Sequence, residues 1–424
     1  MEARVLGCPN LRFKVIPHPF GGLKESPVRE LARRICPELE DALMNIGASR
    51  PNDSAEVSGQ ARYLTIETDD ELSWVLYEKE LTDGLPVIAP TPERVEGMLK
   101  YWDCNSKDIF GSIPPLNDNI TYEVLAANAV MAGCLPEHFP IIINALKAML
   151  DPEFKLQGVQ TTTHPVGPVI ILSGPLAREL KIQSGTGCMG PGFAANSCIG
   201  RAVRLILMNC GGARPGKYDK ATHGQPGKYG LCFAENEEAS PFTPFRTEFG
   251  VNREYTTVTV IPGEAPHNIN DHGSVSADGL MRTIAGTMAT TGNNNKYWNG
   301  DTFVVLSPEH AGILAHEGLT KEEVRRELHC LARVPVSIMS QKEFEDAKKM
   351  KESTDGSRPY VDYVDSDGRV AVVPTPDHIK IIVAGGEGKH SMWIPTLGMC
   401  YSITNVITNA KGEPVRTLSD FLPD

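Results

Sequence analysis

The residues with the greatest chemical potential in this chain lie in the glycine-rich stretch that starts at Ser184. Gly187, Gly190 and Gly192 precede an apolar helical repeat over 193–209. Glycines at this density allow tight turns and the close approach of a ligand, and a following helix N-terminus presents free N–H groups to an anion. We expect these glycines to bind a small polar or anionic molecule. The alternative is a turn that only permits close helix packing.

Two cysteines and an amide accompany this turn. Cys188 lies in the loop, whereas Asn196 and Cys198 lie in the first turns of the predicted helix. A thiol near a helix N-terminus has its thiolate form favoured, which makes it a better nucleophile. We therefore predict Cys188 as a catalytic nucleophile, and Asn196 and Cys198 as substrate-binding residues. Cys198 can alternatively be a small buried hydrophobe.

The spacing of Gly185, Gly187 and Gly190 formally matches the G-x-G-x-x-G dinucleotide pattern. That fingerprint requires a strand directly before it and an acidic residue about 20 positions later. Neither is present, which argues against a NAD(P) site. No P-loop spacing occurs in this stretch either, so the cofactor remains undetermined.

The densest cluster of imidazole, amide and carboxylate groups is the segment 266–273, which follows a predicted strand. Here His267 or His272 can act as an acid–base group, and Asp271 can orient it. His267 and His272 can alternatively ligate a divalent metal ion, although their spacing is not that of a zincin helix. A hydrogen-bonded loop anchor would also explain the cluster.

Two further strand exits carry polar residues. The segment 307–310 has a serine cap and ends in His310, and the glycine-rich turn 385–391 contains Lys389 and Ser391. We predict that His310, Lys389 and Ser391 contact the substrate, with Lys389 neutralising an anion. Helix capping and a tight turn with a solvated lysine are the alternatives.

The elements that position these residues alternate between strands and helices. Strands are predicted over 166–173, 255–261, 302–307 and 379–386, with helices between them. This alternation favours an α/β fold with a largely parallel sheet over about 166–400. Ligands bind beyond the carboxyl ends of the strands in such sheets, where the polar exits lie.

Three regions are expected along the chain. Residues 1–47 are a partial α/β segment, which must be docked on the core or completed by another chain, because one strand cannot pair with itself. Residues 48–60 are a polar linker and 61–150 are mainly helical. Residues 151–424 form the α/β core domain with the candidate site.

Composition excludes several classes of protein. The chain has 424 residues, 41% of them hydrophobic, and a formal net charge of −12. An acidic protein of ordinary hydrophobicity is not expected to wrap nucleic acid or lie on an anionic membrane. Its ten cysteines include no CxxC pair, which suits free thiols in a reducing compartment. We therefore expect a cytoplasmic protein.

Several segments resemble the UGSC-motif (UGSC-like) proteins, a group with selenocysteine and cysteine members. The resembling segments are 15–47, 81–95, 173–180, 196–209, 267–274, 307–324 and 383–391. The motif itself would precede Val15 and is not present, and Cys8 lies in Gly-Cys-Pro. The resemblance implies redox or thiol chemistry, with a small partner subunit bearing a CGSC-type motif, a homo-oligomer, or a chain that works without the motif.

The leading hypothesis is an enzyme that acts on a small polar or anionic molecule by thiol-assisted chemistry, as an oxidoreductase, lyase or hydrolase. In this hypothesis Cys188 or a partner's thiol is the nucleophile. The second hypothesis is a metal-assisted hydrolase or lyase that uses the His267/His272 loop. The third is a large scaffolding subunit of a heteromeric complex whose small subunit carries the reactive thiol.

Overall fold

The computed structural model describes residues 25–44, 64–66, 68–353 and 362–422, and the chain divides into two compact units, Met1–Glu71 and Leu72–Asp424. In the first unit, the predicted helix from Ser26 is confirmed as α2 (Glu25–Met44). The predicted strand at 11–16, its glycine turn and the linker 48–60 lie outside the described residues.

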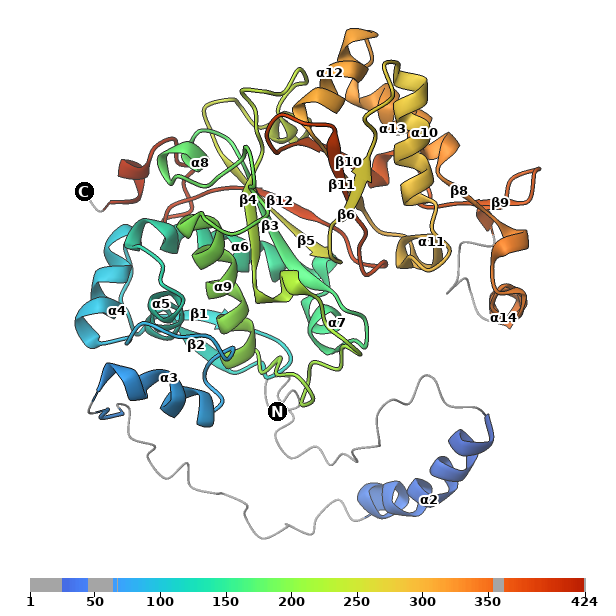
Figure 1. Cartoon of the computed structure of the whole chain (residues 1–424). Helices are drawn as coiled ribbons and strands as arrows, with labels where there is room; N and C mark the ends of the chain where they lie inside the picture. Colours follow the sequence, from blue (N-terminus) through green and yellow to red (C-terminus); the bar gives the residue numbers. More distant parts are fainter. Residues whose placement is uncertain (1–24, 45–63, 67, 354–361, 423–424) are drawn as a thin grey trace. The chain divides into compact units, whose positions relative to one another are not determined.

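The second unit is mixed α/β (Figure 1), in agreement with the predicted class. The helices, of which α3 begins in the first unit, are α3 (Asp69–Glu78), α4 (Pro92–Met98), α5 (Tyr122–Met131), α6 (Phe139–Met149), α7 (Leu156–Thr161), α8 (Leu176–Glu179), α9 (Ala194–Asn209), α10 (Ala277–Met288), α11 (Asn294–Trp298), α12 (Pro308–His316), α13 (Lys321–Leu331) and α14 (Gln341–Ser353). The strands are β1 (Ile109–Ser112), β2 (Asn119–Thr121), β3 (Gly167–Ser173), β4 (Leu231–Ala234), β5 (Thr257–Gly263), β6 (His267–Asn270), β7 (Thr302–Leu306), β8 (Arg333–Pro335), β9 (Arg369–Ala371), β10 (Ile379–Val383), β11 (His390–Ile394) and β12 (Ile403–Val406).

Local sequence signals start several of these helices. The Ser276 side chain accepts a hydrogen bond from the backbone N–H of Gly279 at the start of α10. Ser307 does the same for His310 at the start of α12, and Thr320 forms a capping box with Glu323 at the start of α13. These caps satisfy backbone N–H groups that have no partner inside the helix.

Two four-stranded sheets form the centre of the second unit. The first sheet has the order β4-β3-β5-β12 and the second has the order β10-β7-β11-β6. In each sheet the first two strands run parallel, and every other pairing is antiparallel. A largely parallel core is therefore not confirmed.

The two sheets are built alike and exchange one strand. Strand β6 follows β5 in sequence but pairs with β11 of the second sheet, and β12 follows β11 but pairs with β5 of the first sheet. The sheets touch where Gly263 bridges Thr396. Reciprocal backbone hydrogen bonds flank this bridge, from Glu264 to the Pro395 carbonyl at 2.8 Å and from Leu397 to the Pro262 carbonyl at 3.1 Å. The arrangement is a pseudo-two-fold relation between the two halves.

Pairing registers support this relation residue by residue. Ile261 of β5 lies opposite Val169 of β3, and Ile394 of β11 lies opposite Phe303 of β7. One residue earlier on the central strands, Val260 pairs with Ile403 of β12 and Trp393 pairs with His267 of β6. Matching Ile261 with Ile394 therefore brings the strands of both sheets into the same pairing register.

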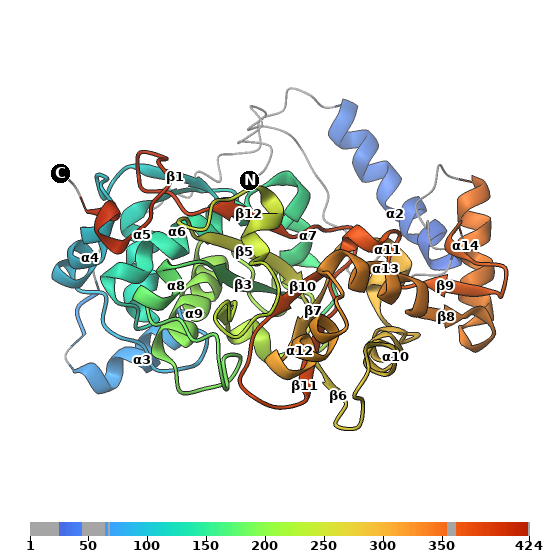
Figure 2. The same cartoon turned by 90° about the horizontal axis from the view of Figure 1, so that it is seen from above.

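The sheets pack face to face, with helices on their outer faces (Figure 2). One hydrophobic cluster lies between the sheets and includes Ile171, Phe233, Phe303 and Ile382. Helices α6 and α9 contact the first sheet, and α10, α12 and α13 contact the second sheet. Both faces of the central strand β3 are thus covered, which explains the almost continuous burial along it.

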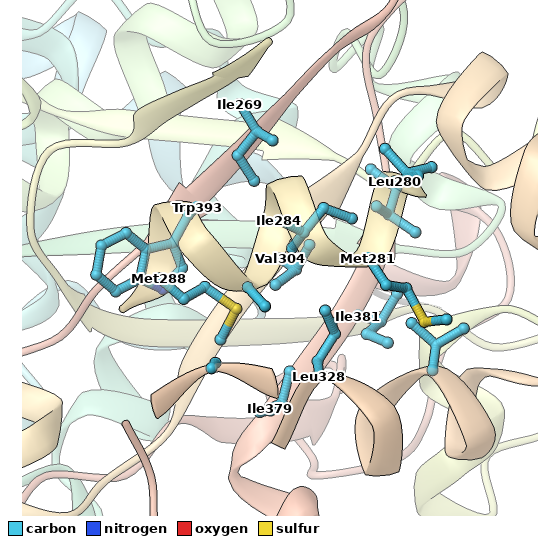
Figure 3. Close-up of a cluster of buried hydrophobic side chains, with 14 of the residues drawn as sticks. Ile269, Leu280, Met281, Ile284, Met288, Val304, Leu328, Ile379, Ile381 and Trp393 are labelled. Atoms are coloured by element: carbon cyan, nitrogen blue, oxygen red, sulfur yellow. The ribbon is translucent and has the colours of Figure 1, made fainter. Parts of the chain in front are cut away.

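A second cluster joins the outer face of the second sheet to its helices (Figure 3). Leu280, Ile284 and Met288 of α10 point toward Ile269 and Trp393 and toward strands β7 and β10. Such burial contributes about 1.5–3 kcal/mol for each large apolar side chain. This packing fixes β6 and β11, whose ends carry the histidines described below.

Candidate functional site

The carboxyl ends of the two parallel strand pairs meet at one joint between the sheets. Asn236, two residues after β4, donates its backbone N–H to the Val383 carbonyl of β10 at 2.8 Å. Its side-chain amide donates to the Gly385 carbonyl at 3.0 Å. In α/β proteins, ligands bind beyond such strand ends, so this joint is the natural place for a site.

The predicted glycine-rich loop lies against this joint. The Gly385 N–H donates to the Ser184 carbonyl at 2.8 Å. Gly386 packs directly on Thr186, because a β-carbon at Gly386 would lie 1.9 Å from the Thr186 hydroxyl oxygen. Gly187 adopts a φ of 73°, a conformation that favours glycine. The predicted loop and the 385–391 turn are therefore in contact.

Asn196 holds the loop rather than facing solvent. Its side chain is buried; its oxygen accepts the Gln183 N–H at 2.8 Å and its amide donates to the Gln183 and Cys188 carbonyls at 3.1 and 3.0 Å. All of these partners are main-chain groups of the loop. The structure thus uses Asn196 as an anchor of the loop, where the sequence suggested a substrate contact.

Cys188 is buried in the hydrophobic cluster between the sheets and is 5% exposed. Burial raises the pKa of its thiol to about 11, although backbone N–H groups of Gly385, Cys188 and Met189 act on the sulfur and offset part of this rise. The thiol is therefore protonated at neutral pH. The N–H groups of Gly385 and Cys188 also donate to the carbonyls of Ser184 and Gly185, at 2.8 and 3.1 Å.

The other predicted loop residues separate from Cys188. Cys198 points toward Gly133 at the end of α5, since a β-carbon there would lie 3.4 Å from its sulfur. Burial raises the pKa of Cys198. Gly190 and Gly192 are exposed and lie on the chain before α9. The Cys198 side chain thus lies between α9 and the segment that follows α5, and not beside Cys188.

His310 and Ser391 form a buried hydrogen-bonded chain. The Ser391 hydroxyl lies 2.7 Å from His310 Nδ1 and accepts the Ser307 N–H at 3.0 Å. His310 Nε2 lies 3.1 Å from the Asp271 carbonyl oxygen. A carbonyl only accepts, so Nε2 carries the proton and Nδ1 accepts from Ser391. Burial lowers the pKa of His310, which keeps the imidazole neutral.

This chain resembles a serine–histidine pair in connectivity, but both side chains are inaccessible. His310 is 0% exposed and Ser391 is 1% exposed. A substrate cannot reach either oxygen or nitrogen in this arrangement. The pair instead fixes the start of α12 to β11 and to the 271 turn, which positions the neighbouring residues.

Asp271 and Lys389 complete that turn. Burial alone would raise the pKa of Asp271, but hydrogen bonds from the Thr283 hydroxyl and from the Ser274 N–H and hydroxyl lower it to about 2. The Lys389 ammonium donates to the carbonyls of His272 and Ser274 at 3.3 and 3.5 Å. Asp271 thus braces the turn as a permanent carboxylate.

His272 meets a histidine other than the predicted one. Its Nε2 lies 3.1 Å from Nε2 of His390, the first residue of β11. His267 pairs across the sheet with Trp393, on the face opposite to Asn268 and Met392. The structure therefore does not bring His267 and His272 together, and no group of three or more His, Cys, Asp or Glu side chains suited to a metal occurs in the described residues.

A buried charge network at the same strand ends was not anticipated from the sequence. Glu235 follows β4 directly, accepts a hydrogen bond from Ser173 at the end of β3, and lies 3.9 Å from the Lys321 ammonium. Burial raises the pKa of Glu235, against the attraction of Lys321. Arg246 pairs with Glu237 beside it. Glu235, Glu237 and Glu238 are close together in the sequence, but the proximity of Glu235 to Lys321 depends on tertiary packing.

No helix of the described residues is long and apolar enough to cross a membrane. No protein-family model, curated protein or solved structure matches this chain.

Proposed function

We propose that this protein is an enzyme that acts on a small polar or anionic molecule by thiol-assisted chemistry at the joint between the two sheets. Cys188 is the nucleophile in this proposal. The observation that carries it is the position of Cys188 in a loop that Asn196 anchors and that rests on the turn at Gly385 and Gly386, beside the strand ends of both sheets. Among the described cysteines with a shifted pKa, Cys188 is the one for which backbone N–H groups counteract burial.

The resting state keeps this thiol protonated and covered. Its activation requires that the loop from Ser184 to Gly192 moves off the 385–391 turn, so that water or substrate relieves the burial that raises the pKa. Gly187 and Gly192, both with positive φ, permit such backbone change in the loop. Lys389, His272 and His390 lie at the far end of the turn and supply hydrogen-bond donors for an anionic substrate.

Ligand protection of the thiol tests this proposal. A panel of small carboxylates, phosphates and polar metabolites is screened by thermal shift, and compounds that bind are tested for turnover. Bound substrate should slow the alkylation of Cys188 by iodoacetamide, as followed by peptide mass spectrometry. A Cys188→Ala variant should lose turnover by at least 100-fold if the thiol is the nucleophile.

A matched control uses the second cysteine of the segment. Cys198→Ala removes a thiol that faces Gly133, outside the joint, and should retain activity. Full turnover by Cys188→Ala, or equal losses in the two variants, would remove the catalytic role of Cys188. The hypothesis of a small thiol-bearing partner depends on the segment that precedes Glu25, which lies outside the described residues.

A further inference from the structure

Two exposed imidazoles lie together at the rim of the second sheet. The Nε2 atoms of His272 and His390 are 3.1 Å apart, and the ring planes make an angle of 74°. His390 begins β11, and His272 lies in the turn after the neighbouring strand β6. One side chain therefore belongs to a strand, and the other to the turn that follows the adjacent strand of the same sheet.

The hydrogen bonds of His390 leave its Nε2 available as a ligand. Its Nδ1 lies 3.0 Å from the Asn268 side-chain oxygen. An amide oxygen only accepts, so Nδ1 carries the proton and Nε2 presents a lone pair. His272 must then donate its Nε2 proton to His390. A metal ion that binds both nitrogen atoms lies to the side of the line between them, and its binding displaces this proton, so that His272 becomes the Nδ1–H tautomer and both Nε2 atoms present lone pairs.

The separation of the two nitrogens fits a shared metal ion. Metal–nitrogen bonds of about 2.0–2.1 Å place two ligand nitrogens about 2.9 Å apart at a right angle and about 3.3 Å apart at a tetrahedral angle. The observed 3.1 Å lies between these values. We propose that His272 and His390 are protein ligands of a divalent first-row metal ion such as Zn²⁺ or Ni²⁺.

The surroundings favour an open site. Asn268 orients His390 through Nδ1, as outer hydrogen-bond partners of metal-bound histidines commonly do. Because no larger metal-ligating group occurs in the described part of the chain, water or a bound molecule fills the remaining coordination positions. The nearby Lys389 ammonium, bound to the His272 carbonyl, lowers cation affinity and favours an anionic molecule on the metal.

The corresponding positions of the first sheet show that the fold does not require histidines here. The register that matches the two sheets places Thr257 at the position of His390 and Thr408 at the position of His272. Thr257 is fully buried, and the Thr408 N–H donates to Asn144 of α6 at 3.0 Å. The first sheet is covered at this point, whereas the second sheet exposes two ligating side chains.

Metal titration of the full-length protein tests the inference. Isothermal titration with ZnCl₂ and with NiCl₂ at pH 7.5 should give one site for each metal. His272→Gln and His390→Gln should each weaken this site by at least tenfold, and Asn268→Ala should weaken it by about 10-fold or more, in the range found for outer partners of ligating histidines. Circular dichroism verifies that each variant remains folded.

His267→Gln is the matched control, because His267 is exposed on the same strand but on the opposite face. It should bind metal as the wild type does. Equal affinity of the wild type and a His272→Gln/His390→Gln double variant would overturn the inference, as would a loss in His267→Gln as large as that in His390→Gln. The result is independent of the Cys188 proposal, which is tested by alkylation and turnover.

Discussion

The contact between Gly386 and the loop at Thr186 is the most direct test of the joint. Gly386→Ala places a methyl group 1.9 Å from the Thr186 hydroxyl oxygen, 2.9 Å from its β-carbon and 3.0 Å from its α-carbon. Rotation of the threonine side chain relieves only the first contact. The loop backbone must therefore move away from the 385–391 turn.

The expected cost follows from these contacts. Overpacking of this kind costs about 1–3 kcal/mol, and the lower entropy of alanine in the unfolded chain returns about 0.4–1 kcal/mol. Gly386 is not among the residues with positive φ, so backbone strain adds nothing. We expect a net loss of about 1–2 kcal/mol. If the same free energy favours the state in which the loop has moved off the turn, that state becomes at least fivefold more populated. The alkylation rate of Cys188 should then rise by the same factor.

Urea unfolding measures the first effect, and iodoacetamide labelling with peptide mass spectrometry measures the second. Gly273→Ala is the control, since no heavy atom lies within 4 Å of its added methyl group. Thr186→Gly in the Gly386→Ala background should restore part of the stability. If Gly386→Ala matches Gly273→Ala in both measurements, the loop does not rest on the turn as described.

Three further outcomes are expected. Burial lowers the pKa of Lys296 to about 8, so the unfolded chain binds a proton that the folded protein lacks between pH 8 and the ordinary lysine value, and the free energy of unfolding rises with pH there. Urea unfolding of the wild type at pH 8 and pH 10 should show a rise of about 2 kcal/mol from this group, which Lys296→Met should remove; an equal rise in both proteins would contradict this. Asn196→Ala leaves the Cys188 carbonyl without its amide partner and should lower the free energy of unfolding by about 2–4 kcal/mol. A decrease below about 0.5 kcal/mol in denaturant unfolding would show that the loop is anchored elsewhere. A chain cut after Gly292 separates β3–β6 from β7–β12. Because each fragment supplies an outer strand to the other fragment's sheet, the two fragments should elute as a one-to-one complex in size-exclusion chromatography. Independent folding of either fragment would refute the strand exchange.

The helices could be predicted because their signals are local. The cap at Ser307, the capping box at Thr320 and the apolar repeat over 193–209 all correspond to observed helices. The strongly apolar strands β3, β7 and β10 were also predicted. Their spacing along the chain, however, cannot reveal the strand order, because β5 returns antiparallel beside β3.

Two segments of the candidate site were predicted to lie close together. The loop at Cys188 and the turn at Lys389 were recognised from glycine density and polar residues after strands, and the structure brings the loop against one end of that turn. His390 was missed, because only the register of β11 on β6 reveals that it faces His272. The burial of His310 and Ser391 was equally inaccessible to a linear pattern.

The sequence by itself determined where helices begin, which strands are buried and which turns are rich in glycine, because these depend on neighbours a few residues apart. Tertiary structure alone decided that β6 and β12 cross to opposite sheets, that Cys188 is buried as a neutral thiol, and that His272 meets His390 instead of His267. Those outcomes depend on contacts between residues about a hundred positions apart, whose free energies no local pattern encodes.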